Sequence, residues 1–202
     1  MDDRRARGIR VLELDRDGGL IGRLLADARA AEAPRTGLHV STVIQDKLRM
    51  LEPRKYGVQG APIGTTGLAF QEVGNVLEDI VSAGLRARIR GWVKPDPRAH
   101  HGLIGSPDGY RARTRTIDEI KATWVKASTF LDSMKLRAYL WQLLFYMEAW
   151  DADRGLLHVL FVCGNYGPPS PIPQTFVVRA SRRAKCENRE ALVQHARDKG
   201  WL

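Results

Sequence analysis

Three charged side chains are spaced in a way that suits metal-dependent hydrolysis. Asp108 lies in a Ser-Pro-Asp-Gly-Tyr run at 106–110, and Glu119 and Lys121 follow after a short gap as Glu-Ile-Lys. Residues 116–123 are predicted to form a strand, in which Glu119 and Lys121 project from the same face. Asp108 is expected at the end of the preceding strand, beside a turn formed by its proline and glycine neighbours, so that strand pairing joins the three groups. Two carboxylates next to an ammonium are what a hard cation and a water nucleophile require.

A long helix is predicted at 67–90, before these strands. Apolar side chains recur at helical spacing along one face, which is expected to pack on the core: Phe70, Val73, Leu77, Ile80, Val81 and Leu85. Glu78 lies on another face, among small and polar residues that would let a ligand approach closely. Taken alone, Glu78 is interpreted as a solvated surface charge. Its place in the helix before the acidic strands makes it a candidate third acidic group of the same site.

A second helix is predicted at 133–150, with Ser133 as its N-cap. Its core face is expected to come from leucine and methionine side chains. Another face carries Lys135, Tyr139, Gln142 and Tyr146, which follow one another at spacings of four, three and four residues. This polar and aromatic stripe is either a half-exposed amphipathic face or a surface that contacts substrate.

Basic residues and two histidines flank the Pro-Asp-Gly run. Arg111, Arg113 and Arg115 alternate, so on one strand they would share a face and contact phosphates beside the acidic groups. The alternative is a solubilising hairpin without a ligand. His100 and His101 precede the strand that delivers Asp108. Both are interpreted either as surface residues or as ligands, and His101 is the better candidate for a ligand.

The remaining elements are predicted from periodicity and turn residues. They are a strand at 10–14, a helix at 20–33, a helix from Ser41 as N-cap to about 52, a loop at 53–66, strands at 156–163 and 175–178 joined by a Gly- and Pro-rich loop at 167–173, and a final helix at about 188–199.

The chain has 202 residues, which predicts one domain. Its net charge of +9 favours polyanions such as nucleic acid, unless the basic surface is simply solvated. The basic residues are scattered over strands and loops, which does not favour binding to an anionic membrane. No apolar run is long enough to span a membrane, and no signal-peptide pattern is present. The two cysteines, Cys163 and Cys186, are far apart in the sequence, which fits a reducing cytoplasm and argues against a zinc or iron–sulfur site.

The order of the candidate residues resembles that of the PD-(D/E)XK nuclease superfamily. The elements that carry the resemblance are a helical acid, the Pro-Asp and Glu-x-Lys strands and a Gln-x-x-x-Tyr helix, with the residues Glu78, Asp108, Glu119, Lys121, Gln142 and Tyr146. Within the superfamily, the chain is most similar to the branch of phage lambda exonuclease, YqaJ-type viral recombinases and RecB-like nuclease domains. The resemblance covers roughly 38–180, with 1–37 as an N-terminal extension and 181–202 as a C-terminal helix.

The resemblance implies a mixed α/β fold, in which helices flank a central mixed β-sheet around a restriction-endonuclease-like αβββαβ core. It also implies that Glu78, Asp108, Glu119 and the backbone carbonyl of Ile120 hold one or two Mg²⁺ ions, for which Mn²⁺ would substitute. His101 is expected as an accessory ligand. Related nucleases with an iron–sulfur cluster carry additional cysteines that this chain lacks, so no cluster is expected.

The other site residues receive expected roles around the metal. Lys121 would orient or deprotonate the attacking water, and Gln142 and Tyr146 would position this water or the substrate strand. The expected DNA contacts are Arg111, Arg113, Arg115, Lys135 and Tyr139.

The resulting hypothesis is a cytoplasmic, Mg²⁺-dependent DNA nuclease, most consistent with an exonuclease that acts on DNA ends in phage-type recombination, repair or processing. The alternatives are a structure- or sequence-specific endonuclease on the same fold and a DNA-binding module without catalysis. The intact Asp108, Glu119 and Lys121 speak against the last alternative. DNA, a strand-annealing or single-strand-binding protein and further copies of the chain are the expected partners, without a membrane.

Overall fold

The structure is a computed structural model that describes residues 36–56, 65–162 and 172–202. Contacts divide the chain into two units, Met1–Pro34 with Pro62–Gln71 and Arg35–Ala61 with Glu72–Leu202. The elements and contacts below belong to the second unit, apart from the first turns of one helix. The strand expected at 10–14, the helix expected at 20–33 and most of the loop at 167–173 lie outside the described residues. The expectation of one domain for the whole chain therefore stays a prediction.

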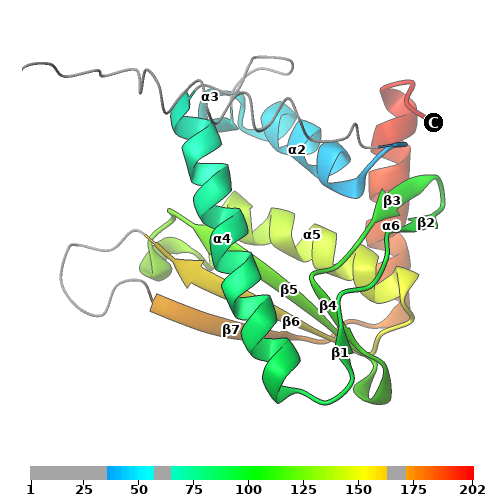
Figure 1. The fold of residues 1–202 in the computed structure, drawn as a ribbon. Coiled ribbons are helices and arrows are strands. Elements are labelled where there is room, and N and C mark those ends of the chain that lie inside the picture. Colours follow the sequence, from blue (N-terminus) through cyan, green and yellow to red (C-terminus); the bar gives the residue numbers. More distant parts are fainter. Residues whose placement is uncertain (1–35, 57–64, 163–171) are drawn as a thin grey trace, which may run out of the picture. The chain divides into compact units, whose positions relative to one another are not determined.

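A mixed five-stranded sheet forms the centre of the fold (Figure 1). Its strands, in spatial order, are β1 (Trp92–Val93), β4 (Gly109–Arg111), β5 (Thr116–Thr123), β6 (Arg154–Phe161) and β7 (Ile172–Val178). The strands β5 and β6 are parallel, and the other neighbours are antiparallel. A separate hairpin of β2 (Arg98–His100) and β3 (Leu103–Gly105) is inserted between β1 and β4.

Five described helices accompany the sheet: α2 (Val40–Leu51), α3 (Pro53–Tyr56), α4 (Thr65–Arg88), α5 (Met134–Ala149) and α6 (Arg182–Asp198). The crossover helix α5 connects the parallel strands β5 and β6 and packs on both, while α2 and α6 pack on α5. The chain order α4, three antiparallel strands, α5 and β6 is the expected αβββαβ order, so the predicted fold class is confirmed.

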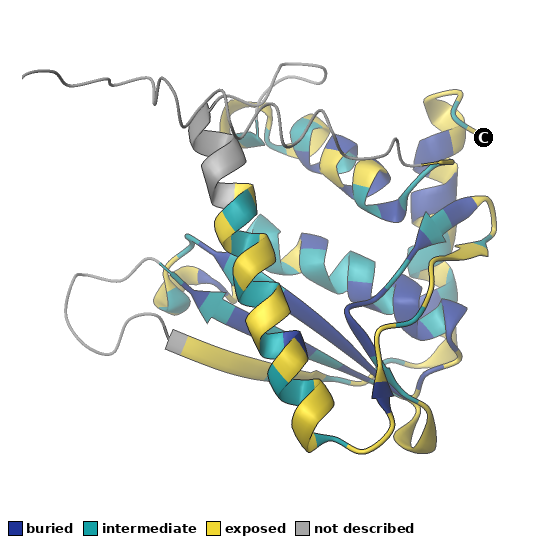
Figure 2. Ribbon diagram, viewed as in Figure 1, coloured by how far each residue is buried: buried dark blue, intermediate teal, exposed yellow. Residues whose placement is uncertain are grey.

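The core lies between the sheet and α5. Ser133 caps α5 as predicted, because its hydroxyl accepts a hydrogen bond from the Leu136 amide. Large buried side chains from both layers, among them Leu143 of α5 and Phe161 of β6, fill the interface. Figure 2 shows that β5 is buried along most of its length. The strand that carries the candidate site is therefore among the most enclosed parts of the fold.

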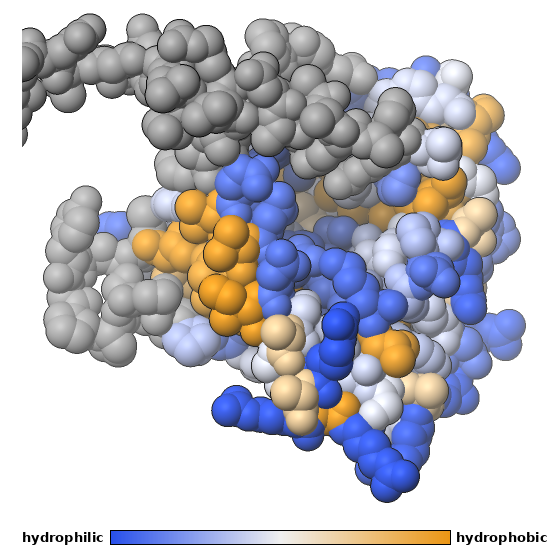
Figure 3. Space-filling model, viewed as in Figure 1, coloured by the Kyte–Doolittle hydropathy of each residue, from blue (hydrophilic) through white to orange (hydrophobic). Residues whose placement is uncertain are grey.

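The described part of α4 differs from its prediction. Val73 and Ile80 were expected on the core face, but they are 44% and 63% exposed. Within residues 72–88, Ser82 is the single buried position. Figure 3 shows hydrophobic side chains gathered on the surface over α4. The amphipathic pattern identified an apolar face correctly, but this face does not join the core of the second unit.

Several element boundaries also differ from the sequence analysis. The N-cap of α2 is His39 rather than Ser41, which lies in the first turn. Part of the expected loop at 53–66 is the short helix α3, which begins with Pro53 because proline fits the first position of a helix. The final helix begins earlier than expected, where Ser181 accepts a hydrogen bond from the Ala184 amide. No helix among the described residues is long and apolar enough to cross a membrane.

Candidate active site

The structure brings together Asp108, Glu119 and Lys121. Glu119 and Lys121 lie two residues apart on β5, so both point to the side of the sheet that α5 covers. The Lys121 ammonium donates to Glu119 Oε1 at 2.5 Å and lies 3.9 Å from Asp108 Oδ2. The Glu119 side chain is 1% exposed, which makes this a buried ion pair with a second carboxylate beside it.

Asp108 reaches the site from the residue that precedes β4. It was expected at the end of the preceding strand, but β3 ends at Gly105 and Asp108 borders the strand that follows it. In the antiparallel pair, Gly109 lies opposite Asp118 of β5. Asp108 precedes Gly109 and therefore lies beside the part of β5 that follows Asp118. Its carboxylate accepts a hydrogen bond from the Ile120 amide at 2.6 Å.

Gly109 is required by a close approach of the Trp92 indole. A Cβ atom at this position would lie 2.3 Å from Trp92 Nε1, far below any normal contact. Trp92 is buried on the neighbouring strand β1 and cannot move aside easily. The glycine in the Pro-Asp-Gly run thus allows the indole to lie against the backbone beside Asp108.

Burial and mutual repulsion set the charge state of the two carboxyl groups. Burial raises the pKa of Asp108 well above its usual range, and the neighbouring Glu119 charge raises it further. Burial also raises the pKa of Glu119, although the Lys121 ammonium opposes this shift. Burial disfavours the charged form of Lys121, but the charges of Glu119 and Asp108 outweigh it and raise the Lys121 pKa. Lys121 is therefore an ammonium in the metal-free protein.

The donor set fits a divalent cation in two respects. The second carboxylate oxygen of Glu119, Oε2, is buried and has no hydrogen-bond partner. A cation at this position would satisfy it and would relieve the repulsion between Glu119 and Asp108. The amide of Ile120 points to Asp108, and because the N–H and C=O of a strand residue face the same edge, its carbonyl faces this side too.

Glu78 lines the same cavity but is held apart from the two carboxylates. Its side chain accepts a hydrogen bond from Lys94 Nζ at 3.0 Å. Over the ranges 36–56, 65–162 and 172–202, no three His, Cys, Asp or Glu side chains are grouped closely enough to hold a metal ion. The Lys94–Glu78 ion pair explains why the expected third acid does not complete the group.

The cavity has a volume of about 630 Å³, and most of the residues that line it carry polar or charged side chains. It is lined by His39, Ser41, Glu78, Lys94, Pro95, Pro97, Ser106, Asp108, Glu119, Lys121, Gln142 and Tyr146. Gln142 and Tyr146 come from α5, and the Gln142 amide donates to the Tyr146 hydroxyl at 2.8 Å. Tyr146 packs against Gly105 of β3, where a Cβ atom would lie 2.4 Å from its ring. The predicted Gln-x-x-x-Tyr pair thus forms one wall of the cavity.

A second cavity of about 280 Å³ shares Ser41, Lys121 and Gln142 with the first one. Lys135 and Tyr139 line this second cavity, so the whole polar stripe of α5 faces the site. Burial lowers the pKa of Lys135, and the Lys55 and Lys121 charges lower it further.

Several wall residues, such as Ser41 and Lys94, were not predicted from the sequence. Ser41 was interpreted as a helix cap, and nothing in the sequence around Lys94 indicates its pairing with Glu78.

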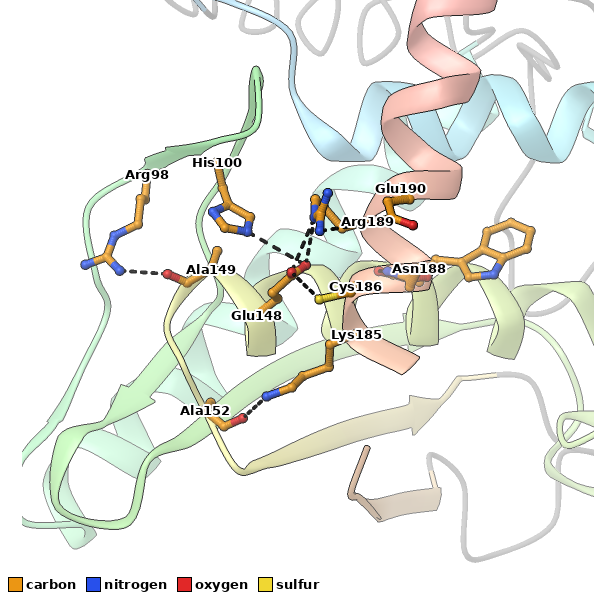
Figure 4. A network of polar contacts seen from close by, with 11 residues as sticks. Arg98, His100, Glu148, Ala149, Ala152, Lys185, Cys186, Asn188, Arg189 and Glu190 are labelled. Atoms are coloured by element: carbon orange, nitrogen blue, oxygen red, sulfur yellow. Dashed lines mark hydrogen bonds and ion pairs between the residues drawn. The ribbon is translucent and has the colours of Figure 1, made fainter. Parts of the chain in front are cut away.

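The structure places His101 away from the cavity of Asp108. It occupies the turn of the β2–β3 hairpin with a positive φ of 51°, is exposed, and lines a separate cavity beside α6. The expectation of a metal ligand at His101 does not fit this position, because the hairpin turn places it beside α6 and outside the cavity of the carboxylates. Figure 4 shows that its neighbour His100 points to Glu148 of α5, which also contacts Arg189 of α6.

The three arginines do not share a strand face. The strand β4 ends at Arg111, and a short 3₁₀ helix (Ala112–Thr114) follows, because the chain turns back at this point into β5. Arg111 forms an ion pair with the buried Asp118 on the other face of the sheet, and Arg115 has a positive φ and contacts Asp151. Arg113 is exposed. The expected row of phosphate contacts is therefore wrong in its geometry.

No family model matches the sequence, and no curated protein matches it. Several solved structures share its fold. The alkaline exonuclease LHK-Exo from Laribacter hongkongensis is 15% identical, with a TM-score of 0.51 over 87% of this chain and 91% of that chain. LHK-Exo in complex with dAMP gives a TM-score of 0.52 at 12% identity, over 80% and 87% of the two chains. The protein SSO0001 gives 0.50 at 11% identity, over 86% and 84%. The fold expected from the resemblance is thus shared with a solved alkaline exonuclease.

Replacement of Gly109 by alanine tests the close packing beside Asp108. Because the new methyl group would overlap the buried Trp92 ring, we expect Gly109→Ala to lower the free energy of unfolding by about 1–3 kcal/mol in a urea titration. Gly84→Ala is the matched control, since nothing lies within 4 Å of the added Cβ atom and alanine favours the α4 helix. Equal urea midpoints for Gly109→Ala and the parent would contradict the packing described here.

Replacement of Asp108 by asparagine tests the repulsion in the site. A carboxyl whose pKa is raised by folding costs stability once it is ionised, so the metal-free Asp108→Asn protein should be more stable than the parent at neutral pH, by about 1 kcal/mol. This gain should vanish in acid, where Asp108 itself becomes protonated. Asp96→Asn removes an exposed carboxylate and should change little. A less stable Asp108→Asn protein at neutral pH in EDTA would refute the repulsion.

Proposed function

We propose that this protein is a metal-dependent deoxyribonuclease that degrades DNA from its ends. The observation that carries the proposal is the convergence of Asp108, Glu119 and Lys121 in one polar cavity. The fold shared with an alkaline exonuclease supports the reaction class, and the complex of that enzyme with dAMP supports a nucleotide as the bound product. The net charge of +9 is consistent with a polyanionic substrate.

We assign the metal to the two carboxylates and the adjoining backbone. Asp108, Glu119 and the Ile120 carbonyl would hold Mg²⁺, or Mn²⁺ in its place, and Glu78 would join them if it exchanged Lys94 for the cation. The buried Glu119 Oε2 without a partner and the raised pKa of Asp108 support this assignment. When bound, such a cation polarises the scissile phosphate and lowers the pKa of a coordinated water.

The side chains around the carboxylates would orient the substrate. Lys121 carries its proton on Nζ and, in the proposed complex, would donate it in a hydrogen bond to the attacking water or to a phosphate oxygen. The Gln142 and Tyr146 pair on α5 would position the same phosphate from the opposite wall. Lys135 and Tyr139 in the adjoining cavity would contact the next part of the strand.

The finer features of the hypothesis also remain proposals. They are dependence on Mg²⁺ rather than another divalent cation, a role in phage-type recombination or repair beside a strand-annealing protein, assembly of several copies and a cytoplasmic location. An endonuclease on the same fold is the second candidate, because no described residue determines whether a DNA end is needed.

A digestion time course with Mg²⁺ tests the function. It compares linear duplex, closed circular duplex and single-stranded DNA, and the Lys121→Ala protein is run in parallel. We expect the parent to degrade linear duplex and to leave the circle intact, and Lys121→Ala to be slower by about 10²-fold or more. Arg183→Ala, which removes an exposed cation on α6, is the matched control and should digest at the parental rate.

The outcomes separate the candidate functions. Nicking of the circle would favour the endonuclease. Salt-sensitive DNA binding without cleavage of any substrate would favour a binding module, and equal rates for Lys121→Ala and the parent would refute the assignment of the site.

A further inference from the structure

A buried polar network lies on the face of the sheet opposite to the candidate active site. Its centre is Asp118, which is completely buried on β5 next to Glu119 but points the other way, because neighbouring strand residues alternate. Neither the resemblance nor the cavity walls include this residue. A fully buried charge directly beside a candidate metal ligand requires an explanation.

Both oxygens of Asp118 are bound by side chains from neighbouring strands. Arg111 of β4 donates through Nε to Oδ2 at 2.7 Å, and its Nη2 contacts Oδ1. His158 of β6 lies with Nε2 2.9 Å from Oδ1, and its Nδ1 lies 2.9 Å from the Thr175 hydroxyl of β7. One chain of contacts therefore crosses all four strands β4, β5, β6 and β7.

The network holds a strand pair that has few other contacts. The strand β4 pairs with β5 over just Gly109–Arg111, and its outer neighbour β1 has two residues. Asp108 immediately precedes β4, and its hydrogen bond to the Ile120 amide requires this register. A slip of one residue would displace Asp108 by about 3.4 Å and turn β4 over. The Arg111–Asp118 pair links the last residue of β4 diagonally to β5 and opposes such a slip.

On its other side, the network joins β5 to the strand that supports α5. His158 ties Asp118 to β6, whose opposite face carries Leu157 and Val159 into the core beneath α5. The same helix carries Gln142 and Tyr146 to the cavity. The network therefore connects the strands that hold the two carboxylates to the strand on which α5 packs.

We propose that Arg111, Asp118 and His158 are positioning residues of the active site, which fix Asp108 relative to Glu119 by locking the register of β4 on β5. This inference rests on the proposed function for its kinetic consequence, but its structural claim concerns the metal-free protein. Arg111, expected from the sequence to contact DNA, thereby receives a different role.

Stability alone is a weak explanation for the network. Well-packed apolar groups often replace a buried ion pair without loss of stability, whereas removal of one partner leaves a buried charge uncompensated. A purely structural pair would therefore be replaceable by an apolar pair with unchanged turnover. A positioning pair would not, because a displacement of about 1 Å in an active site costs up to about 10²-fold in rate.

The test uses the double variant Arg111→Met/Asp118→Leu, with Arg111→Lys as a milder variant that keeps the charge and one hydrogen bond. Arg183→Met/Glu187→Leu removes an exposed ion pair on α6 and is the matched control. Four quantities are measured: the urea midpoint, the exchange rate of the Ile120 amide in the metal-free protein, and kcat and KM on linear duplex DNA. Kinetics are recorded at a temperature at which each variant is folded.

We expect the double variant to exchange the Ile120 amide at least tenfold faster than the parent and to lose at least tenfold in kcat with little change in KM. Arg111→Lys should recover part of both losses, and the control pair should match the parent. Unchanged Ile120 exchange in a folded double variant would overturn the proposal. If the double variant does not fold, Arg111→Lys decides by the same exchange measurement.

Failure of the proposed function and failure of the positioning role give different results. A parent protein that cleaves no DNA would refute the proposed function, and the Ile120 exchange rates would still establish or overturn the positioning role. A cleaving parent with unchanged kcat in the folded double variant would overturn the positioning role alone.

Discussion

Two buried carboxylates, Asp108 and Glu119, share one ammonium, and the fold must hold this unfavourable arrangement in place. Burial and their mutual repulsion raise the pKa of Asp108, and the Lys121 ammonium compensates only part of the charge. Such a site is stabilised when a cation binds and is strained without one, which is a common compromise between function and stability. Glu119 and Lys121 accordingly lie on the buried strand β5, and the crossover helix α5 packs over this strand.

Close backbone approaches and a buried network provide this rigidity. Gly109 lets Trp92 lie against the chain beside Asp108, and Gly105 lets Tyr146 reach the cavity wall. On the opposite face, Asp118 binds side chains from the strands on either side of β5. The site is therefore built from both faces of one sheet, although its chemistry is confined to one face.

The sequence predicted the parts of the site that lie on regular, strongly patterned elements. Residues 116–123 form β5 as predicted, and α5 begins after the predicted Ser133 cap, since strand-favouring residues and helix capping are local signals. The sequence did not predict the backbone conformation at Arg113 and Arg115, because an alternating run of charges is compatible with a strand or with the 3₁₀ turn that forms there. The diversion of Glu78 by Lys94 and the binding of Arg111 by Asp118 depend on residues that meet only in the folded chain. Local pattern carries no information about such pairs.

Calorimetric titration of the metal-free protein with Mn²⁺ tests most directly whether Asp108 and Glu119 form a cation site. A cation site at these carboxylates predicts saturable binding by the parent, accompanied by proton release at a pH at which Asp108 is partly protonated, and loss of this binding in Glu119→Gln. Retention of parental affinity and proton release in Glu119→Gln would contradict it, as would a parent protein that binds no divalent cation.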